Sequence, residues 1–384
     1  MRIVGVEAIP FRLPVRREFR WAGMQADLGS FVLVRLRTDE GLVGLGEATP
    51  LPDWGGDFGR HAGETQESVV SMVTNVLTPG LLGRDPTAIE PLVAEMDRVL
   101  WGHSYAKAAI DIALHDLWAK AAGQPLYAML GGAVRSNVPL AHMIGLMPES
   151  EAVDEGIAAF HDGVTTLQVK GGEDPPRDLR LVSELRARLG PSVRLRLDAN
   201  QGYGRAKEAV NILRRFDSGL LDYVEQPVVG LEDMAAVTRA IDVAVIADES
   251  CWDPYDALEL VQAHAADVIS IYLAKAGGIA RARQVAAIAT AARLPCDVNG
   301  SIESGIGNAA NLHFALATPA VTMASVMPVS APAGLNPFRT GGFYYTDDII
   351  LEPFRAADGA LLPLESPGLG VELDEGKLQR FRVD

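Results

Sequence analysis

The chain has 384 residues, with 34 Lys and Arg against 50 Asp and Glu, which gives a formal net charge of −16. Hydrophobic residues make up 48% and charged residues 22%, a composition that excludes a disordered chain and supplies a substantial core. The acidic balance argues against a nucleic-acid-binding or anionic-membrane-binding protein, because both of these ligands require clustered Lys and Arg.

The cysteines and the start of the chain indicate the compartment. Cys251 and Cys296 do not form a CxxC pair, so the sequence supports neither a disulfide framework nor a cysteine zinc site. No basic segment followed by a long apolar run opens the chain, and no window is apolar for long enough to cross a bilayer. We therefore expect a cytoplasmic protein.

Residues 1–130 predict an α+β domain. Three stretches alternate apolar and polar residues, as antiparallel strands do: 2–13, 30–37 and 42–48. A helical pattern follows over 104–122 and stops at Gly123, just before Pro125, which is a typical helix ending.

Residues 131–330 predict a (β/α)8-type barrel. Short apolar runs alternate with helical stretches, and this alternation implies a parallel sheet closed into a modified TIM barrel. The eight predicted strands are 138–142, 165–170, 193–198, 221–225, 243–247, 267–273, 294–299 and 321–326. Residues 331–384 are rich in Gly, Pro and aromatic residues, and we expect them to pack back on the first, capping domain.

Charged side chains stand at or just beyond the ends of five consecutive predicted strands. They are Lys170, Asp198, Glu225, Asp248 and Lys275. Each interval is about one strand and helix, so the five side chains should converge at the mouth of the barrel. Three carboxylates form an oxygen-only site, which suits a hard octahedral ion such as Mg²⁺ better than zinc.

Two lysines beside such an ion predict proton transfer. A nearby dication and partial burial both disfavour the ammonium form, so either Lys170 or Lys275 can serve as a base. A metal-bound substrate carboxylate acidifies its α-proton, because the ion stabilises the charge that develops on the enolate oxygens. A single Asp or Glu at a strand end is more often a helix cap or a surface ion pair. Five charged residues at the ends of five consecutive strands favour a catalytic site instead.

The motifs around these residues resemble the enolase superfamily, and within it the muconate lactonizing enzyme subgroup. The resemblance spans nearly the whole chain and is most specific at four strand ends: Asp198-Ala199-Asn200-Gln201, Glu225-Gln226-Pro227, Ala247-Asp248-Glu249-Ser250 and Lys275-Ala276-Gly277-Gly278. It implies that Asp198, Glu225 and Asp248 bind Mg²⁺, with Mn²⁺ as a substitute, and that Lys170 and Lys275 form the acid/base pair. It also implies a supporting role for Glu303.

Two features refine the resemblance. The predicted seventh strand, 294–299, contains no histidine, which favours the two-lysine subgroup over the mandelate racemase subgroup. Gln168 stands where the subgroup usually has the first lysine of Lys-x-Lys, so Lys170 lacks that neighbouring charge. Five polar residues are candidates for substrate binding or support of the site: Gln168, Asn200, Glu249, Asn299 and Glu303. A purely structural role remains open for all of these except Asn299.

Two loops of the capping domain are expected to close over the barrel and to set specificity. They are 16–29, which carries Trp21, and 50–60, which carries Trp54. A tryptophan face can receive a substrate ammonium, which points to amino or imino acids and betaines. The alternative is that both tryptophans only pack the domain interface.

We predict that the substrate is a small carboxylate and that the enzyme is a homo-oligomer. The region around Lys170 and 142–145 resembles cis-3-hydroxy-L-proline dehydratases most, which makes dehydration the first hypothesis. Epimerisation of proline betaine or a dipeptide, and lactonizing cycloisomerisation, remain open because these reactions share the same strand-end residues. A barrel that binds a ligand without turnover is the alternative outside enzymes.

Overall fold

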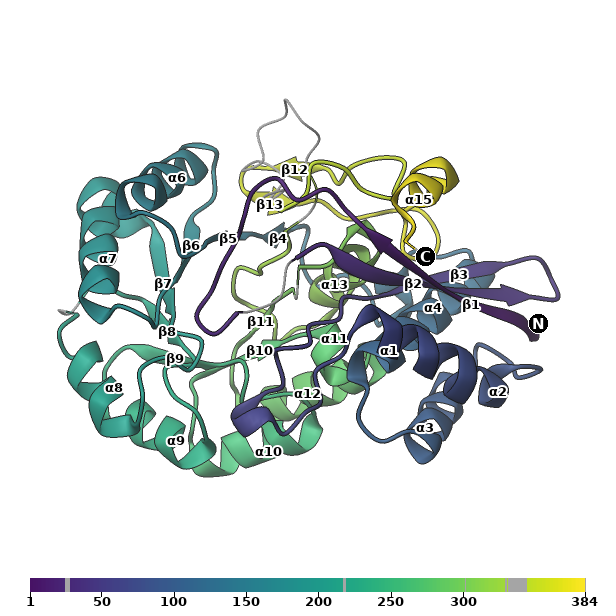
Figure 1. The fold of residues 1–384 in the computed structure, drawn as a ribbon, viewed down its shortest axis with the longest axis horizontal. Helices are drawn as coiled ribbons and strands as arrows, with labels where there is room; N and C mark the ends of the chain where they lie inside the picture. The colour runs from purple at the N-terminus through teal and green to yellow at the C-terminus, as the bar shows by residue number, and fades with distance from the viewer. Residues whose placement is uncertain (25–27, 217–218, 301, 329, 331–343, 384) are drawn as a thin grey trace.

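The computed structural model describes residues 1–24, 28–216, 219–300, 302–328, 330 and 344–383. Two units lie side by side, a barrel of teal and green elements and a first domain in purple and blue (Figure 1). The last residues, in yellow, lie beside the first strands (Figure 1). Within the described ranges, no helix is both long and apolar enough to span a membrane.

The first domain is an antiparallel sheet covered by helices. Its strands pair in the order β1-β2-β3. Strands and helices of this domain are β1 (Ile3–Arg12), β2 (Ser30–Thr38), β3 (Val43–Ala48), α1 (Gln66–Ser71), α2 (Thr78–Leu81), α3 (Ile89–Val99), α4 (Ser104–Ala122) and α5 (Leu126–Met129). Helix α4 ends as the sequence predicts, because Gly123 adopts a left-handed φ of 64° that favours glycine.

Seven parallel strands form the barrel sheet in the order β11-β10-β9-β8-β7-β6-β5. The strands are β5 (Ala141–Ile144), β6 (Thr166–Lys170), β7 (Arg194–Asp198), β8 (Tyr223–Glu225), β9 (Ala244–Ala247), β10 (Val268–Ile271) and β11 (Cys296–Val298). The helices are α6 (Glu149–His161), α7 (Pro175–Leu189), α8 (Ala206–Leu213), α9 (Leu231–Ala240), α10 (Pro254–Ala263), α11 (Leu273–Ala276), α12 (Ile279–Ala292) and α13 (Gly305–Ala317).

The eighth predicted strand, 321–326, closes the ring without forming a regular strand. Three isolated parallel bridges join it to both neighbours: Cys296 with Val321, Asn299 with Val326, and Leu140 with Ser325. The amides of Thr322 and Met323 both donate to the carbonyl of Cys296, at 3.0 and 3.2 Å, and this bulge interrupts the ladder. The predicted barrel is therefore present, with a bulged eighth position.

The described part of the C-terminal segment touches both units. Strand β13 (Ala360–Leu361) pairs with β12 (Ala356–Ala357) and with β4 (Val138–Pro139), which precedes the barrel sheet. Helix α15 (Glu375–Phe381) lies near β1, and Glu375 pairs with Arg35 at 2.8 Å. The domain boundaries at residues 130 and 330 stay predictions.

Candidate active site

The five charged residues that the sequence places at strand ends lie together in the barrel. Lys170, Asp198 and Glu225 end β6, β7 and β8 and are aligned by the strand register. Asp248 follows β9, and Lys275 lies in α11, just after β10. All five are nearly completely buried, so their charges interact in a site that is largely shielded from bulk solvent.

Each lysine binds one of the carboxylates. The Nζ atom of Lys170 lies 2.5 Å from Oδ2 of Asp198, and that of Lys275 lies 2.6 Å from Oδ1 of Asp248. Burial disfavours the ammonium form of Lys170, but Asp198 and Glu225 outweigh it and raise the pKa of Lys170. The sequence prediction of a lowered pKa concerns Lys170 beside a dication and stays a prediction; without the ion, the ion pair to Asp198 dominates.

Glu225 is held by three donors, which lie in β6, in β7 and just after β11. Its Oε2 accepts from Nε of Arg196 at 2.5 Å and from Nε2 of Gln168 at 2.6 Å. Among the described residues, its Oε1 accepts one bond, from Nδ2 of Asn299 at 3.1 Å. Burial alone would raise the pKa of Glu225, but the adjacent guanidinium of Arg196 outweighs burial and lowers it.

The other predicted polar residues border this cluster. Gln168 also donates to Oδ2 of Asp198 at 3.0 Å, and Asn200 donates to Oε1 of Glu249 at 3.1 Å. Glu303 is buried just before α13, and its carboxylate lies against Gly300. All the polar candidates named from the sequence therefore lie in or beside the barrel mouth.

The chemistry of the cluster fits a hard dication. Burial, with repulsion from Asp248 and Asp198, raises the pKa of Glu249 well above its ordinary value. Within the described residues no three His, Cys, Asp or Glu side chains form a preassembled metal cage, because the lysines and Arg196 bind the carboxylates. The cluster nevertheless holds more buried carboxyl groups than cations, and a divalent ion would offset this excess: Asp198, Glu225, Asp248, Glu249 and Asp297, against Lys170, Arg196 and Lys275.

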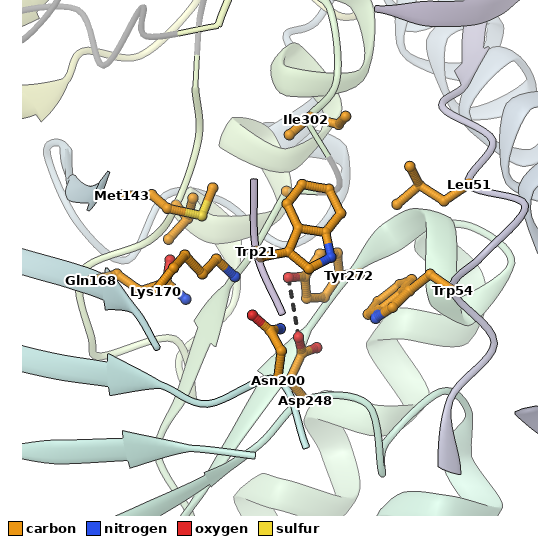
Figure 2. A pocket seen from close by; sticks show the side chains of 12 residues that line it. Trp21, Leu51, Trp54, Met143, Gln168, Lys170, Asn200, Asp248, Tyr272 and Ile302 are labelled. Carbon is orange, nitrogen blue, oxygen red and sulfur yellow. Dashed lines mark hydrogen bonds between the residues drawn. The ribbon is translucent and has the colours of Figure 1, made fainter. Parts of the chain in front are cut away.

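A cavity of about 40 Å³ adjoins the cluster (Figure 2). Trp21 lies across the cavity, with Lys170 on one side and Trp54 on the other (Figure 2). The lining residues are Trp21, Leu51, Trp54, Met143, Gln168, Lys170, Asn200, Asp248, Tyr272, Gly300, Ile302 and Val326. The Nζ atoms of the lysines approach aromatic rings: Lys170 lies 5.7 Å from Trp21, and Lys275 lies 4.5 Å from Tyr272.

The first capping loop carries Trp21 from the first domain to the barrel. The backbone oxygen of Arg20 accepts from the amide of Leu146, and Arg17 pairs with Glu155 on α6 at 2.6 Å. Phe19 packs edge-on against Tyr344, with ring centroids 4.7 Å apart. Residues 25–27 of this predicted loop lie outside the described residues. Because its anchors are on the barrel, Trp21 both packs at the interface and lines the cavity.

The second capping loop is anchored in a similar way. Arg60 pairs with Asp256 on α10 at 2.6 Å, and Asp57 accepts from Ser250 Oγ at 3.0 Å. Trp54 packs against Trp252, with ring centroids 5.1 Å apart, and also lines the cavity. The two readings of Trp54, interface packing and cavity wall, are thus both consistent with its place.

Sequence reasoning missed Arg196 and Asp297. Arg196 stands two residues before Asp198, and Asp297 stands two before Asn299, so each shares a strand face with a site residue. Arg196 binds Asp297 across the barrel interior. The sequence feature that could have identified both residues is a charged side chain at an inward-facing position of an otherwise apolar strand. Buried charged side chains are rare unless they have a partner.

Comparisons with known proteins agree with this geometry. The family model described as "Mandelate racemase / muconate lactonizing enzyme, N-terminal domain" matches residues 6–131, and that described as "Enolase C-terminal domain-like" matches 151–377. An L-Ala-D/L-Glu epimerase of Bacillus subtilis is 35% identical over 378 residues, covering 97% of each chain. Muconate cycloisomerase 1 of Rhodococcus opacus is 34% identical over 379 residues, covering 97% of this chain and 96% of that one. The crystal structure of an N-succinyl Arg/Lys racemase from Bacillus cereus has a TM-score of 0.90 at 29% identity, covering 100% of this chain and 99% of that chain.

Proposed function

Because the chain belongs to the muconate lactonizing enzyme subgroup of the enolase superfamily, we propose that it is a Mg²⁺-dependent epimerase of a small carboxylate. The reaction removes the proton α to the carboxylate and returns a proton to the opposite face of the same carbon. Asp198, Glu225 and Asp248 would hold the ion. When bound, the ion supplies positive charge to the substrate carboxylate as the α-proton leaves.

The observation that carries the proposal is the placement of the two lysines. With eight positions in the ring, β6 and β10 lie four positions apart, on opposite sides of the barrel. Lys170 ends β6 and Lys275 follows β10. A substrate between them presents one face of its α-carbon to each lysine, which is the arrangement that inversion requires.

Proton transfer uses the Nζ atoms of both lysines. One lysine accepts the α-proton, and the other donates a proton to the opposite face. Only a neutral amine accepts a proton, whereas Asp198 stabilises the ammonium form of Lys170. Lys170 must therefore leave its bond to Asp198 before it acts, while the neutral amide of Gln168 stays beside the same carboxylate.

Epimerisation has more support than dehydration. The similar proteins named above are an epimerase, a racemase and a cycloisomerase, and none is named a dehydratase. The first hypothesis, cis-3-hydroxy-L-proline dehydratase, therefore stays an untested prediction. The prediction of a homo-oligomer likewise stays open.

The lining of the cavity favours a substrate with a single carboxylate. Apart from Lys170, the described lining residues include no cationic side chain that could bind a second carboxylate. The polar lining residues are Gln168, Asn200 and Asp248. The rest of the wall is largely aromatic or apolar and includes Trp21, Trp54 and Met143. Indole faces attract cations, so an amino acid, imino acid or betaine fits this wall better than a dicarboxylate such as muconate. Cycloisomerisation is therefore the second candidate.

Deuterium exchange tests the proposal. The purified protein with Mg²⁺ in D₂O would be given proline derivatives, betaines, amino acids, dipeptides and muconate, with EDTA as the control. We expect metal-dependent α-deuteration and formation of the enantiomer or epimer inverted at the α-carbon for one class of monocarboxylate. Turnover of muconate without exchange on any monocarboxylate would establish cycloisomerisation instead. No reaction with any substrate would favour a binding protein.

A further inference from the structure

Arg196 is a buried arginine that lies between two carboxylates inside the barrel. Its side chain is 1% exposed, and its guanidinium connects Glu225 on β8 with Asp297 on β11. Its strand neighbour in register is Gln168, which is neutral and donates to the same oxygen of Glu225. The other donor to Glu225, Asn299, is also a neutral amide. Arg196 thus makes the charged hydrogen bond to this carboxylate.

The two oxygens of Glu225 accept different numbers of hydrogen bonds. Oε2 accepts two short bonds, at 2.5 Å from Arg196 and 2.6 Å from Gln168. Oε1 accepts one longer bond, at 3.1 Å. Since each carboxylate oxygen can accept about two bonds, Oε1 retains capacity for a further partner.

We propose that Arg196 is the positioning residue that fixes Glu225 for metal binding, and that Asp297 in turn fixes Arg196. This inference rests on the proposed function. The Arg196 guanidinium binds Oε2 and so fixes the orientation of the whole carboxylate, whose Oε1 accepts a single long bond from Asn299. Asp297 holds the other side of the guanidinium, so the fork cannot rotate away from Glu225. Partners that orient metal ligands in this way commonly change metal affinity 10- to 100-fold.

The test measures the affinity for Mn²⁺ alone, by calorimetry and by the EPR spectrum of the ion. Arg196→Met is expected to raise the Kd for Mn²⁺ by about 10- to 100-fold. Arg196→Lys keeps a charge but loses the fork, so its Kd should lie between those of the wild type and Arg196→Met. Arg194→Met is the matched control, because Arg194 lies on the same strand but is 62% exposed and pairs with Asp222.

A second variant covers the case in which Arg196→Met does not fold. Removing Arg196 alone leaves Asp297 and Glu225 buried without their cation, which is strongly destabilising. The double variant Arg196→Met/Asp297→Asn removes one charge of each sign and avoids most of this cost. Circular dichroism would establish that each variant is folded. A folded double variant with the Mn²⁺ affinity of the wild type would overturn the role of Arg196, as would an equal loss in Arg194→Met. A wild-type protein that binds no divalent ion would instead overturn the proposed function.

Discussion

Lys275 is bound to both the side chain and the backbone of Asp248. Its Nζ atom lies 2.6 Å from Oδ1 and 2.6 Å from the carbonyl oxygen of that residue, and 3.2 Å from the carbonyl oxygen of Ser270. An ammonium group has three donors, and these three acceptors satisfy all of them. Lys275 is therefore held on three sides and must give up a contact before its Nζ atom can reach a substrate.

Each of the two lysines should remove the α-proton from a different enantiomer of the substrate. Lys170→Ala and Lys275→Ala are each expected to lower the epimerisation rate by about 10²- to 10⁴-fold, because one proton transfer is lost. Each variant should retain α-deuterium exchange on the enantiomer whose proton faces the remaining lysine. Proton NMR in D₂O with each pure enantiomer measures this, with Lys207→Ala, an exposed lysine, as the control. Equal loss of exchange for both enantiomers in both variants would contradict the two-base assignment.

Trp21 and Trp54 should favour cationic substrates over neutral substrates of the same shape. Trp54→Leu and Trp21→Leu are expected to raise KM for a cationic substrate by about 2- to 30-fold, the range of a cation–π contribution. A neutral substrate of the same shape should show a much smaller change. Steady-state kinetics on the matched pair measures this difference, and Trp101→Leu is the control because Trp101 is 90% exposed. The same KM increase for both substrates would mean that the tryptophans only pack.

Glu47 should make stability depend on pH. This carboxyl on β3 accepts from the amide and hydroxyl of Ser304 at the start of α13, and burial raises its pKa to about 8. The folded state therefore holds a proton that the unfolded chain releases near the ordinary value of 4.5. The stabilisation is complete below that ordinary value and is lost as pH rises through about 8.

The variant Glu47→Gln should remove this loss. Between pH 5 and 8 the free energy of unfolding of the wild type should fall by up to about 1.4 kcal/mol per pH unit from this group, and that of Glu47→Gln should fall less. Urea unfolding at one-unit pH intervals measures both slopes. Glu95→Gln, at an exposed ion pair with Arg98, should keep the slope of the wild type. Identical slopes in Glu47→Gln and the wild type would refute the assignment.

Gly46 should tolerate no side chain. A Cβ atom at this position on β3 would lie 1.9 Å from the carbonyl oxygen of Ala109 on α4. Gly46→Ala must push the helix from the sheet, and we expect a loss of about 1–3 kcal/mol or more in the free energy of unfolding. Gly5→Ala on β1 is the control, since its nearest neighbours would lie 3.8 Å away. Urea unfolding compares them, and equal stability would show that β3 and α4 separate easily.

The repeating pattern of the sequence determined the barrel and the position of its charged residues. Alternation of apolar and polar residues depends on neighbours along one strand, so β1, β2 and β3 could be located within one or two residues. The spacing of Lys170, Asp198 and Glu225 reflects one strand and helix per unit, and parallel register then aligns them. These features are local or periodic, which is why the sequence alone contains them.

Only the tertiary structure decided which charges pair. Arg196 and Asp297 are 101 residues apart, and their contact depends on β7 and β11 facing each other across a closed ring. The bulge in 321–326 likewise depends on two amides that share one distant carbonyl, that of Cys296. The raised pKa of Lys170 also depends on its 2.5 Å contact with Asp198, a residue on the neighbouring strand. Such pairings are set by packing between strands and helices far apart in the chain, and no pattern within one segment specifies them.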